Sequence, residues 1–258
     1  MLPLITCSNC NHAFTGEFCN QCGQKNSHRL TMGHLAHDVV HAITHADKGF
    51  FHLFLQLFYK PGVVAREYII EGKRKRYFLP FQYLVIISAI ATFVAVNSHF
   101  FDTTAQFMTP EMSATTAKQQ EFMLKAKEFQ TRYYNLLILI QLPFFALASF
   151  WVFKKQRLYF AEHLTLQTFL IAQTAVFGMI MMLFMSLIKI NQGYMLVFMS
   201  LISILYQILA YKQFFGSTTS NSMLKGLAAY IVGFLLFLIF IILVSFIVVV
   251  IMVANKGA

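Results

Sequence analysis

Five long apolar segments constrain the fold of this chain more than any other feature of its sequence. They cover residues 79–100, 134–153, 166–188, 194–211 and 228–253. A helix needs about 20 predominantly apolar residues to cross the roughly 30 Å hydrocarbon core of a bilayer, and each segment is close to that length. Charged residues make up 12% of the 258 positions, which is about half of their share in soluble domains. The segments therefore predict an all-α integral membrane protein with about five transmembrane helices.

The four cysteines of the chain form two C-x2-C pairs separated by eight residues. They are Cys7, Cys10, Cys19 and Cys22. Each pair can supply two thiolates from one tight turn, so two turns can close a tetrahedral four-sulfur zinc site. Such a site leaves no position open for water, which favours a structural or docking role over catalysis. Two disulfide bonds are the alternative, but thiolates persist in the reducing cytoplasm, where we expect this end of the chain.

Residues 1–27 are accordingly predicted to be a small zinc ribbon, folded largely by its metal. Phe14 and Phe18 are candidates to cover the metal. The net charge of +10 would suggest a nucleic-acid partner for a soluble protein. The ribbon, however, offers only Lys25 and His12 for such contacts, so we expect none. In a membrane protein, cytoplasmic loops and anionic lipid headgroups account for an excess of Lys and Arg.

Residues 28–78 are expected to form cytoplasmic amphipathic and interfacial helices, in front of a five-span membrane domain at 79–258. Four histidines and an acid lie on or near one helical face: His34, His37, Asp38, His41 and His45. Histidines four residues apart can bind a metal together, and the Asp could be a further ligand or orient a histidine. The alternative is the polar face of an interfacial helix. The apolar run Phe50–Phe58 is too short to span, so it fits a segment lying in the interface.

The stretch before the first apolar segment supplies candidate functional residues at the cytoplasmic boundary. They are Arg66, Glu67, Tyr68, Lys73 and Arg74. Lys73–Arg76 are four consecutive basic residues, and we expect them to contact anionic lipid headgroups and to help set the topology.

Glu162 and His163 are expected on the same side of the membrane, just before the third span. A carboxylate beside an imidazole could transfer protons. Adjacent residues on a helix point about 100° apart, however, which favours separate contacts for the two side chains.

The apolar segments contain no acidic residue, and no Lys or Arg lies near the centre of one. Proton- and ion-coupled transporters usually keep ionisable groups at membrane depth. The polar residues in the segments are neutral, and helix–helix hydrogen bonds account for them. They are Gln82, Ser88, Thr92, Gln141, Gln173, Thr174 and Gln207.

The distribution of basic residues predicts the orientation of the spans. With the N-terminus inside, 14 of the 20 Lys and Arg residues fall on the cytoplasmic side and six outside. This asymmetry places the N-terminus in the cytoplasm and, with five spans, the C-terminus outside. Only residues 190–193 separate the third and fourth segments, so a re-entrant pair is the alternative there.

Several motifs together resemble one known family. They are C-x2-C-x8-C-x2-C-G-Q, then Pro61-Gly62-x3-Arg66-Glu67-Tyr68-x3-Gly72-Lys73-Arg74, then Pro80-Phe81, then Glu162-His163. The combination is similar to a family of bacterial inner-membrane proteins that carry a domain of unknown function behind an N-terminal zinc ribbon. The resemblance covers residues 7–84 best. It implies this architecture and a bacterial inner-membrane location, and it implies no activity.

We therefore expect a non-catalytic adaptor or assembly factor that binds zinc and docks a protein partner through its ribbon and interfacial helices. Anionic membrane lipid is the second expected partner. One alternative is a transporter or channel for a lipid-like or weakly polar substrate. Another is a membrane enzyme that uses the histidine face and the Glu162-His163 pair.

Overall fold

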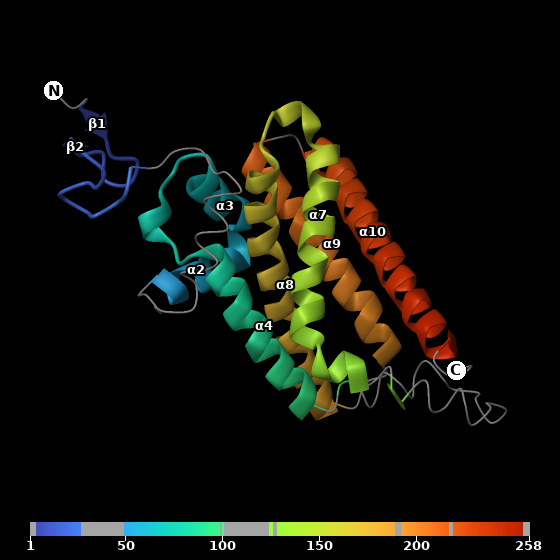
Figure 1. The fold of residues 1–258 in the computed structure, drawn as a ribbon. Coiled ribbons are helices and arrows are strands. Elements are labelled where there is room, and N and C mark those ends of the chain that lie inside the picture. Colours follow the sequence, from blue (N-terminus) through green and yellow to red (C-terminus); the bar gives the residue numbers. More distant parts are fainter. Residues whose placement is uncertain are drawn as a thin grey trace.

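The computed structural model of the chain describes residues 4–26, 49–98, 100, 124–125, 128–188, 192–216 and 219–254. The predicted histidine face at His34–His45 lies outside the described residues. The described part consists of a small N-terminal ribbon, two short helices and five long helices, and Figure 1 shows their arrangement.

The ribbon contains one two-stranded antiparallel sheet. Strand β1 (Ile5–Thr6) pairs with strand β2 (Ala13–Phe14), and Ile5 lies opposite Phe14. An isolated bridge between Phe18 and Lys25 closes the second half of the ribbon. Only Phe14 and two cysteines form its buried apolar cluster, so a bound metal would have to supply most of its stability.

Two short helices follow, α2 (Gly49–Tyr59) and α3 (Pro61–Ile69). Pro61 opens α3 at a position where the missing N–H is tolerated, and the fixed φ of proline suits the first helical turn. With 11 residues α2 is too short to span a bilayer, as expected. A 3₁₀ turn, η1 (Arg74–Arg76), then leads into the bundle.

The five long helices are apolar enough to cross a membrane. They are α4 (Pro80–Asn97), α7 (Tyr134–Val152), α8 (Phe160–Ile188), α9 (Gln192–Phe215) and α10 (Thr219–Ala254). The five-helix membrane architecture predicted from the sequence is therefore confirmed.

Two helices begin more than one turn before the predicted segments. Helix α8 begins six residues earlier than the segment at 166–188, so Glu162 and His163 lie in its first turn rather than before it. The expectation that no acidic residue lies in a span is wrong at this edge, because the span-length part of α8 starts at Phe160. Helix α10 likewise begins nine residues before the segment at 228–253. In both cases the first turns of the helix are polar, so a search for apolar runs does not detect them.

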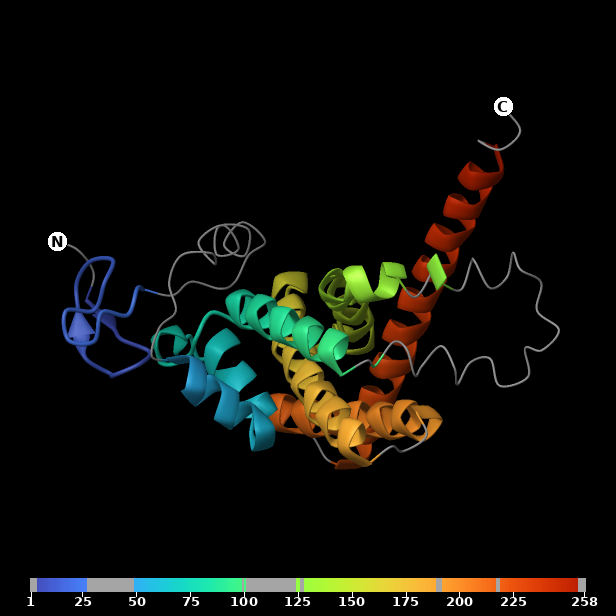
Figure 2. The same ribbon diagram turned by 90° about the horizontal axis from the view of Figure 1, so that it is seen from below.

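The bundle is built around α8. Helices α4, α7 and α9 all pack against it, and α10 packs against α7 and α9. Figure 1 and Figure 2 both place the ribbon and the two short helices beside α4, on the other side of the bundle from α10. The short 3₁₀ connection between α7 and α8, η3 (Lys154–Gln156), lies at one end of the bundle, and α10 ends at the other.

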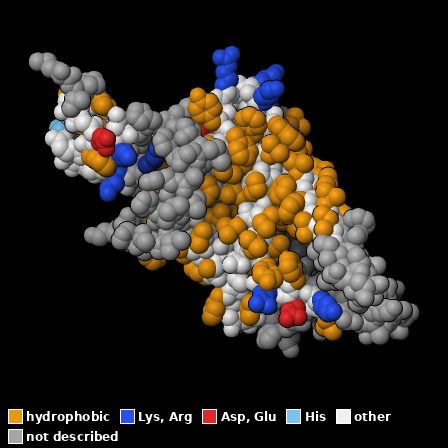
Figure 3. Space-filling model, in the orientation of Figure 1, with side chains coloured by type: hydrophobic (Ala, Val, Ile, Leu, Met, Phe, Trp, Pro, Cys, Tyr) orange, Lys and Arg blue, Asp and Glu red, His pale blue; other side chains and the backbone are white. Residues whose placement is uncertain are grey.

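Hydrophobic side chains cover the side of the bundle seen in Figure 3, and charged side chains gather at its two ends. Exposed apolar residues along the outer helix α10 include Ile231, Leu238 and Ile242. A soluble protein rarely exposes such a continuous apolar surface, whereas membrane lipid would cover it. The surface therefore agrees with a membrane environment.

Candidate metal centre and boundary motif

Two knuckles with the same backbone pattern position the cysteines. In the first, the N–H of Cys7 donates to the carbonyl of His12, and the N–H of Asn11 donates to the carbonyl of Cys7, both at 2.9 Å. In the second, the N–H of Cys19 donates to the carbonyl of Gln24, and the N–H of Gly23 donates to the carbonyl of Cys19, both at 2.8 Å. Asn11 and Gly23 both have positive φ, which lets each turn close tightly.

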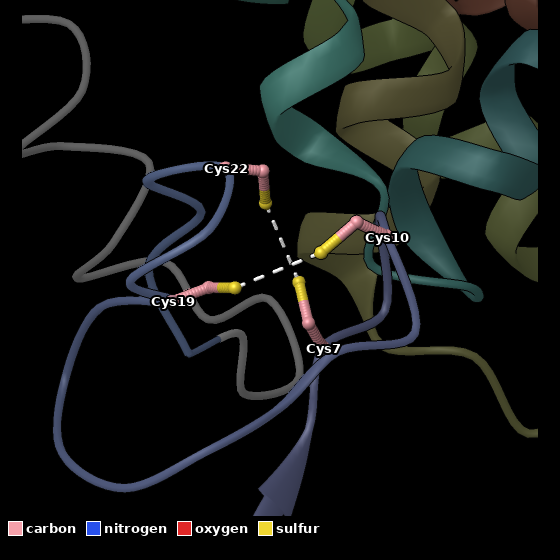
Figure 4. Close-up of side chains that lie close together, drawn as sticks. All are labelled: Cys7, Cys10, Cys19 and Cys22. Atoms are coloured by element: carbon pink, nitrogen blue, oxygen red, sulfur yellow. Dashed lines mark hydrogen bonds between the residues drawn. The ribbon is translucent and has the colours of Figure 1, made fainter.

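The four sulfur atoms converge on one point, as Figure 4 shows. The Sγ atoms of Cys7 and Cys22 are 3.6 Å apart, as are those of Cys10 and Cys19, and all four lie within 4.8 Å of one another. A zinc ion with Zn–S bonds of about 2.3 Å would place its sulfurs about 3.8 Å apart. These separations are too long for disulfide bonds and suit a tetrahedral metal ion.

The thiols of this cluster differ in acidity. Desolvation raises the pKa of Cys22, but hydrogen bonds from the Gln24 backbone, the Asn9 side chain and neighbouring thiols outweigh it and lower the pKa to about 7. A backbone hydrogen bond from His12 lowers the pKa of Cys10, but burial and the three neighbouring thiols raise it to about 12. The metal-free cluster therefore retains protons at neutral pH, and a cation would displace them on binding.

The two ribbon phenylalanines have different environments. Phe14 is buried against Cys7 and Cys19, as expected for a residue that covers the metal. Phe18 is 57% exposed, with Nζ of Lys25 lying 5.9 Å from its ring centroid. Leu4 is exposed as well. The ribbon thus presents two apolar side chains to its surroundings.

Gln24 connects the ribbon to the membrane domain, and sequence reasoning did not single it out. Its side chain is buried, Nε2 donates to the carbonyl of Gly72 at 2.5 Å, and Oε1 accepts from the N–H of Lys75 at 2.8 Å. The amide therefore binds both ends of the turn that precedes α4. The available sequence signal was the C-x2-C-G-Q pattern, which contains Gln24 without indicating its contact.

Glu67 is the centre of a charged cluster beside this turn. Its carboxylate accepts from the Tyr77 hydroxyl at 2.5 Å and lies 3.3 Å from a guanidinium nitrogen of Arg76 and 3.7 Å from Nζ of Lys73. Lys73 also approaches Glu71 at 2.7 Å, and these acids raise its pKa, with the hydrogen bond to Glu71 as the largest cause. Lys73 and Arg76 of the basic run are therefore ion-paired with Glu67.

The side chains of Arg66 and Tyr68 on α3 have different surroundings. Arg66 is about half exposed and lies 4.0 Å from Glu71. Tyr68 is buried, and its ring packs edge-on against Phe169 of α8, with the Arg74 guanidinium 6.0 Å from the Tyr68 centroid. Of the boundary candidates, Tyr68 is thus part of the packing between α3 and α8, and Arg66 is the more accessible.

Glu162 and His163 make separate contacts. Glu162 accepts a hydrogen bond from the backbone N–H of Tyr159 at 2.7 Å, which satisfies a free donor at the start of α8. Nδ1 of His163 lies 3.0 Å from the hydroxyl oxygen of Ser149 on α7. Glu162 thus contacts the start of its own helix, His163 contacts α7, and both side chains are buried.

A polar strip runs through the bundle core on α8 and α9. Gln167 donates to the Tyr211 hydroxyl at 2.5 Å, and Gln173 accepts from the Tyr83 hydroxyl at 2.9 Å. In the described part of the bundle core, one polar atom on each of four side chains of α8 and α9 has no hydrogen-bond partner. These atoms are His163 Nε2, Gln167 Oε1, Gln173 Nε2 and Gln207 Oε1. Direct helix–helix hydrogen bonds therefore account for only part of this polarity.

One family model matches the chain, over residues 47–92, and its description is "Protein of unknown function (DUF3667)". The matched residues comprise α2, α3, the basic turn and most of α4. No curated protein and no solved structure matches the chain. The match thus coincides with the segment between the ribbon and the bundle. The description of the family names no activity.

Proposed function

We propose that this protein is a non-catalytic adaptor or assembly factor of the bacterial inner membrane, with one zinc ion held by Cys7, Cys10, Cys19 and Cys22. Its domains are the zinc ribbon at 1–27, cytoplasmic interfacial helices at 28–78 and a five-span membrane domain at 79–258. The ribbon faces the cytoplasm and the C-terminus faces the periplasm. Anionic lipid at the basic turn and a protein at the ribbon are the partners.

The chemistry of the ribbon supports a docking role. Four thiolates complete the coordination of a zinc ion, so no position remains for an activated water or a substrate. The ion would instead hold the two knuckles together. On the resulting surface, Leu4 is 74% exposed and Phe18 is 57% exposed. A small rigid module with exposed apolar side chains suits a protein interface. The exposure of Leu4 and Phe18 is the observation that best supports docking through the ribbon.

The remaining boundary candidates support the same view. Glu162 caps α8, Tyr68 packs against α8, and Glu67 ties the basic turn to α3. Each of these contacts stabilises the platform that carries the ribbon. Arg66, with half of its side chain exposed, remains a candidate partner contact on α3.

Transport of a small polar or lipid-like substrate is the second candidate function. The unpartnered polar atoms of Gln167, Gln173 and Gln207 favour it, because a buried polar atom without a partner is costly inside a membrane. Water or a substrate hydroxyl could satisfy these atoms. A third candidate, an enzyme using the face at His34–His45, depends on residues outside the described part of the chain.

Affinity purification in mild detergent, followed by mass spectrometry, tests the adaptor proposal. We expect a defined protein to co-purify with the wild-type chain and to be lost with Phe18→Ser. Thr15→Ser, a conservative change at a neighbouring exposed position, is the matched control. Zinc content and membrane insertion should be unchanged in both variants. Co-purification that is insensitive to Phe18→Ser and to removal of residues 1–27 would reject docking through the ribbon.

A further inference from the structure

The two knuckles of the ribbon differ at one equivalent position. His12 and Gln24 follow the second cysteine of their pair by two residues, and their carbonyls accept the same backbone hydrogen bond. His12 is exposed, whereas Gln24 is only 4% exposed and its amide contacts the turn before α4. One copy of the motif is therefore used as a contact with the rest of the protein.

The position of Gln24 depends on the metal-binding turn. Its carbonyl accepts from Cys19, and the residue before it, Gly23, donates to the carbonyl of Cys19 at a φ of +70°. Because the ribbon has almost no apolar core, these turns would not persist without a metal. Loss of the ion would therefore release the backbone that aims the Gln24 side chain.

The other partner of Gln24 is the basic turn, which Glu67 also holds through its ion pairs with Lys73 and Arg76. Gly72 has a φ of +69°, and the turn is held by hydrogen bonds from Lys73 to the carbonyl of Glu67 and from Arg74 to that of Gly72. The Gln24 amide adds a donor to the Gly72 carbonyl and an acceptor for the Lys75 N–H. It thereby binds the backbone just before the four consecutive basic residues and again within them.

We propose that metal occupancy of the ribbon controls the conformation of the basic turn at 72–76 through Gln24. With the metal bound, Gln24 holds the turn against α3 and α4, and the basic side chains project in one fixed arrangement at the membrane boundary. Without the metal, the two hydrogen bonds of the Gln24 side chain are lost and the turn becomes mobile. This inference rests on the metal binding proposed above, and it makes the ribbon a metal-dependent latch on the membrane domain.

Limited trypsin digestion of the full-length protein in lipid nanodiscs tests the latch, because the turn contains four cleavage sites. We expect cleavage after residues 73–76 to be about tenfold faster after zinc removal with a chelator than in the zinc-loaded protein, as two hydrogen bonds are lost. Cleavage in the α7–α8 connection after Lys154, which is far from the ribbon in the sequence, is the internal reference.

Two variants separate the latch from the metal site. Gln24→Ala should keep one zinc per chain and still show the fast cleavage at 73–76. His12→Ala, the same substitution at the equivalent position of the other knuckle, should behave as wild type. Equal cleavage rates for wild type and Gln24→Ala, both with zinc bound, would overturn the latch. A wild-type chain that binds no zinc would instead overturn the proposed metal site, whatever the effect of Gln24→Ala.

Discussion

The backbone N–H of Gly62 donates to Oε1 of Gln213 at 3.0 Å, so that α3 lies directly on α9. The Gln213 amide also donates to the carbonyl of Tyr59 at 2.9 Å, which holds the turn between α2 and α3. A Cβ atom at position 62 would lie 2.1 Å from the carbonyl oxygen of Ala210. The glycine is therefore required by the close approach of the two helices.

We expect Gly62→Ala to destabilise the protein by about 1–3 kcal/mol or more, because α3 must move away from the backbone of α9. Thermal unfolding in detergent should show a lower midpoint. Gly178→Ala is the matched control, since its Cβ would meet only the flexible end of Met199 at 3.7 Å. A Gly62→Ala midpoint equal to that of wild type would contradict the close contact.

Cys10→Ser should lower the zinc content of the purified protein well below one per chain. The ribbon should then unfold, while the five spans remain inserted, because the bundle has its own apolar core. Metal analysis and hydrogen exchange of residues 4–26 measure the two effects. Ser8→Ala, on the same turn but not a ligand, should bind zinc normally. Full zinc occupancy in Cys10→Ser would remove the four-cysteine site from consideration.

Acid should release the metal. A thiol must lose its proton to bind zinc, so lowering the pH favours the protonated, metal-free cluster and weakens binding. The Cys10 pKa of about 12 and the Cys22 pKa of about 7 in the metal-free cluster mean that protons already compete at neutral pH. A zinc-sensitive dye should therefore report faster release at pH 5 than at pH 7.5. Release that is independent of pH would indicate ligands other than thiolates.

The apolar runs predicted the five long helices because the length of a span and its hydrophobicity are local properties. The ribbon cysteines were equally clear, since ligand spacing is local too. Gln24 and Gly62 could not be assigned this way. Their roles depend on Gly72 and Gln213, which are 48 and 151 residues away. The start of α8 could not be predicted because Glu162 and His163 are polar and resemble loop residues in the sequence. Their hydrogen-bond partners, the Tyr159 N–H at the helix start and Ser149 on α7, are known only from the structure.

Glu67→Gln should weaken the basic turn, because a neutral amide holds Arg76 and Lys73 less well than a carboxylate does. The pairs are partly exposed, so we expect a loss of only about 1 kcal/mol. A double-mutant cycle with Tyr77→Phe should give a coupling energy, since Tyr77 donates to the same carboxylate. Glu71→Gln, at a more exposed acid, should have the smaller effect, and additive losses would contradict the Glu67–Tyr77 contact.

Fusion reporters should place the two ends of the chain on opposite sides of the membrane. Five spanning helices would carry the backbone across an odd number of times, and the excess of basic residues on one side predicts that the N-terminus is inside. A reporter before Met1 should be active in the cytoplasm, and one after Ala258 in the periplasm. Both ends on one side would mean an even number of spans, and the bounds of the third and fourth spans, α8 and α9, would then have to be redrawn.

Ser149→Ala tests whether the histidine of α8 is structural. Ser149 is fully buried, and it accepts from or donates to Nδ1 of His163, depending on the tautomer. Removing the hydroxyl leaves that nitrogen without its partner in the bundle core, which should cost about 1–3 kcal/mol and lower the unfolding midpoint. Ser88→Ala is the control, since its hydroxyl donates to the carbonyl of Val85 in its own helix. Ser149→Ala could instead leave the unfolding midpoint unchanged and abolish function in cells. The Ser149–His163 hydrogen bond would then have a catalytic role, and the adaptor proposal would fail.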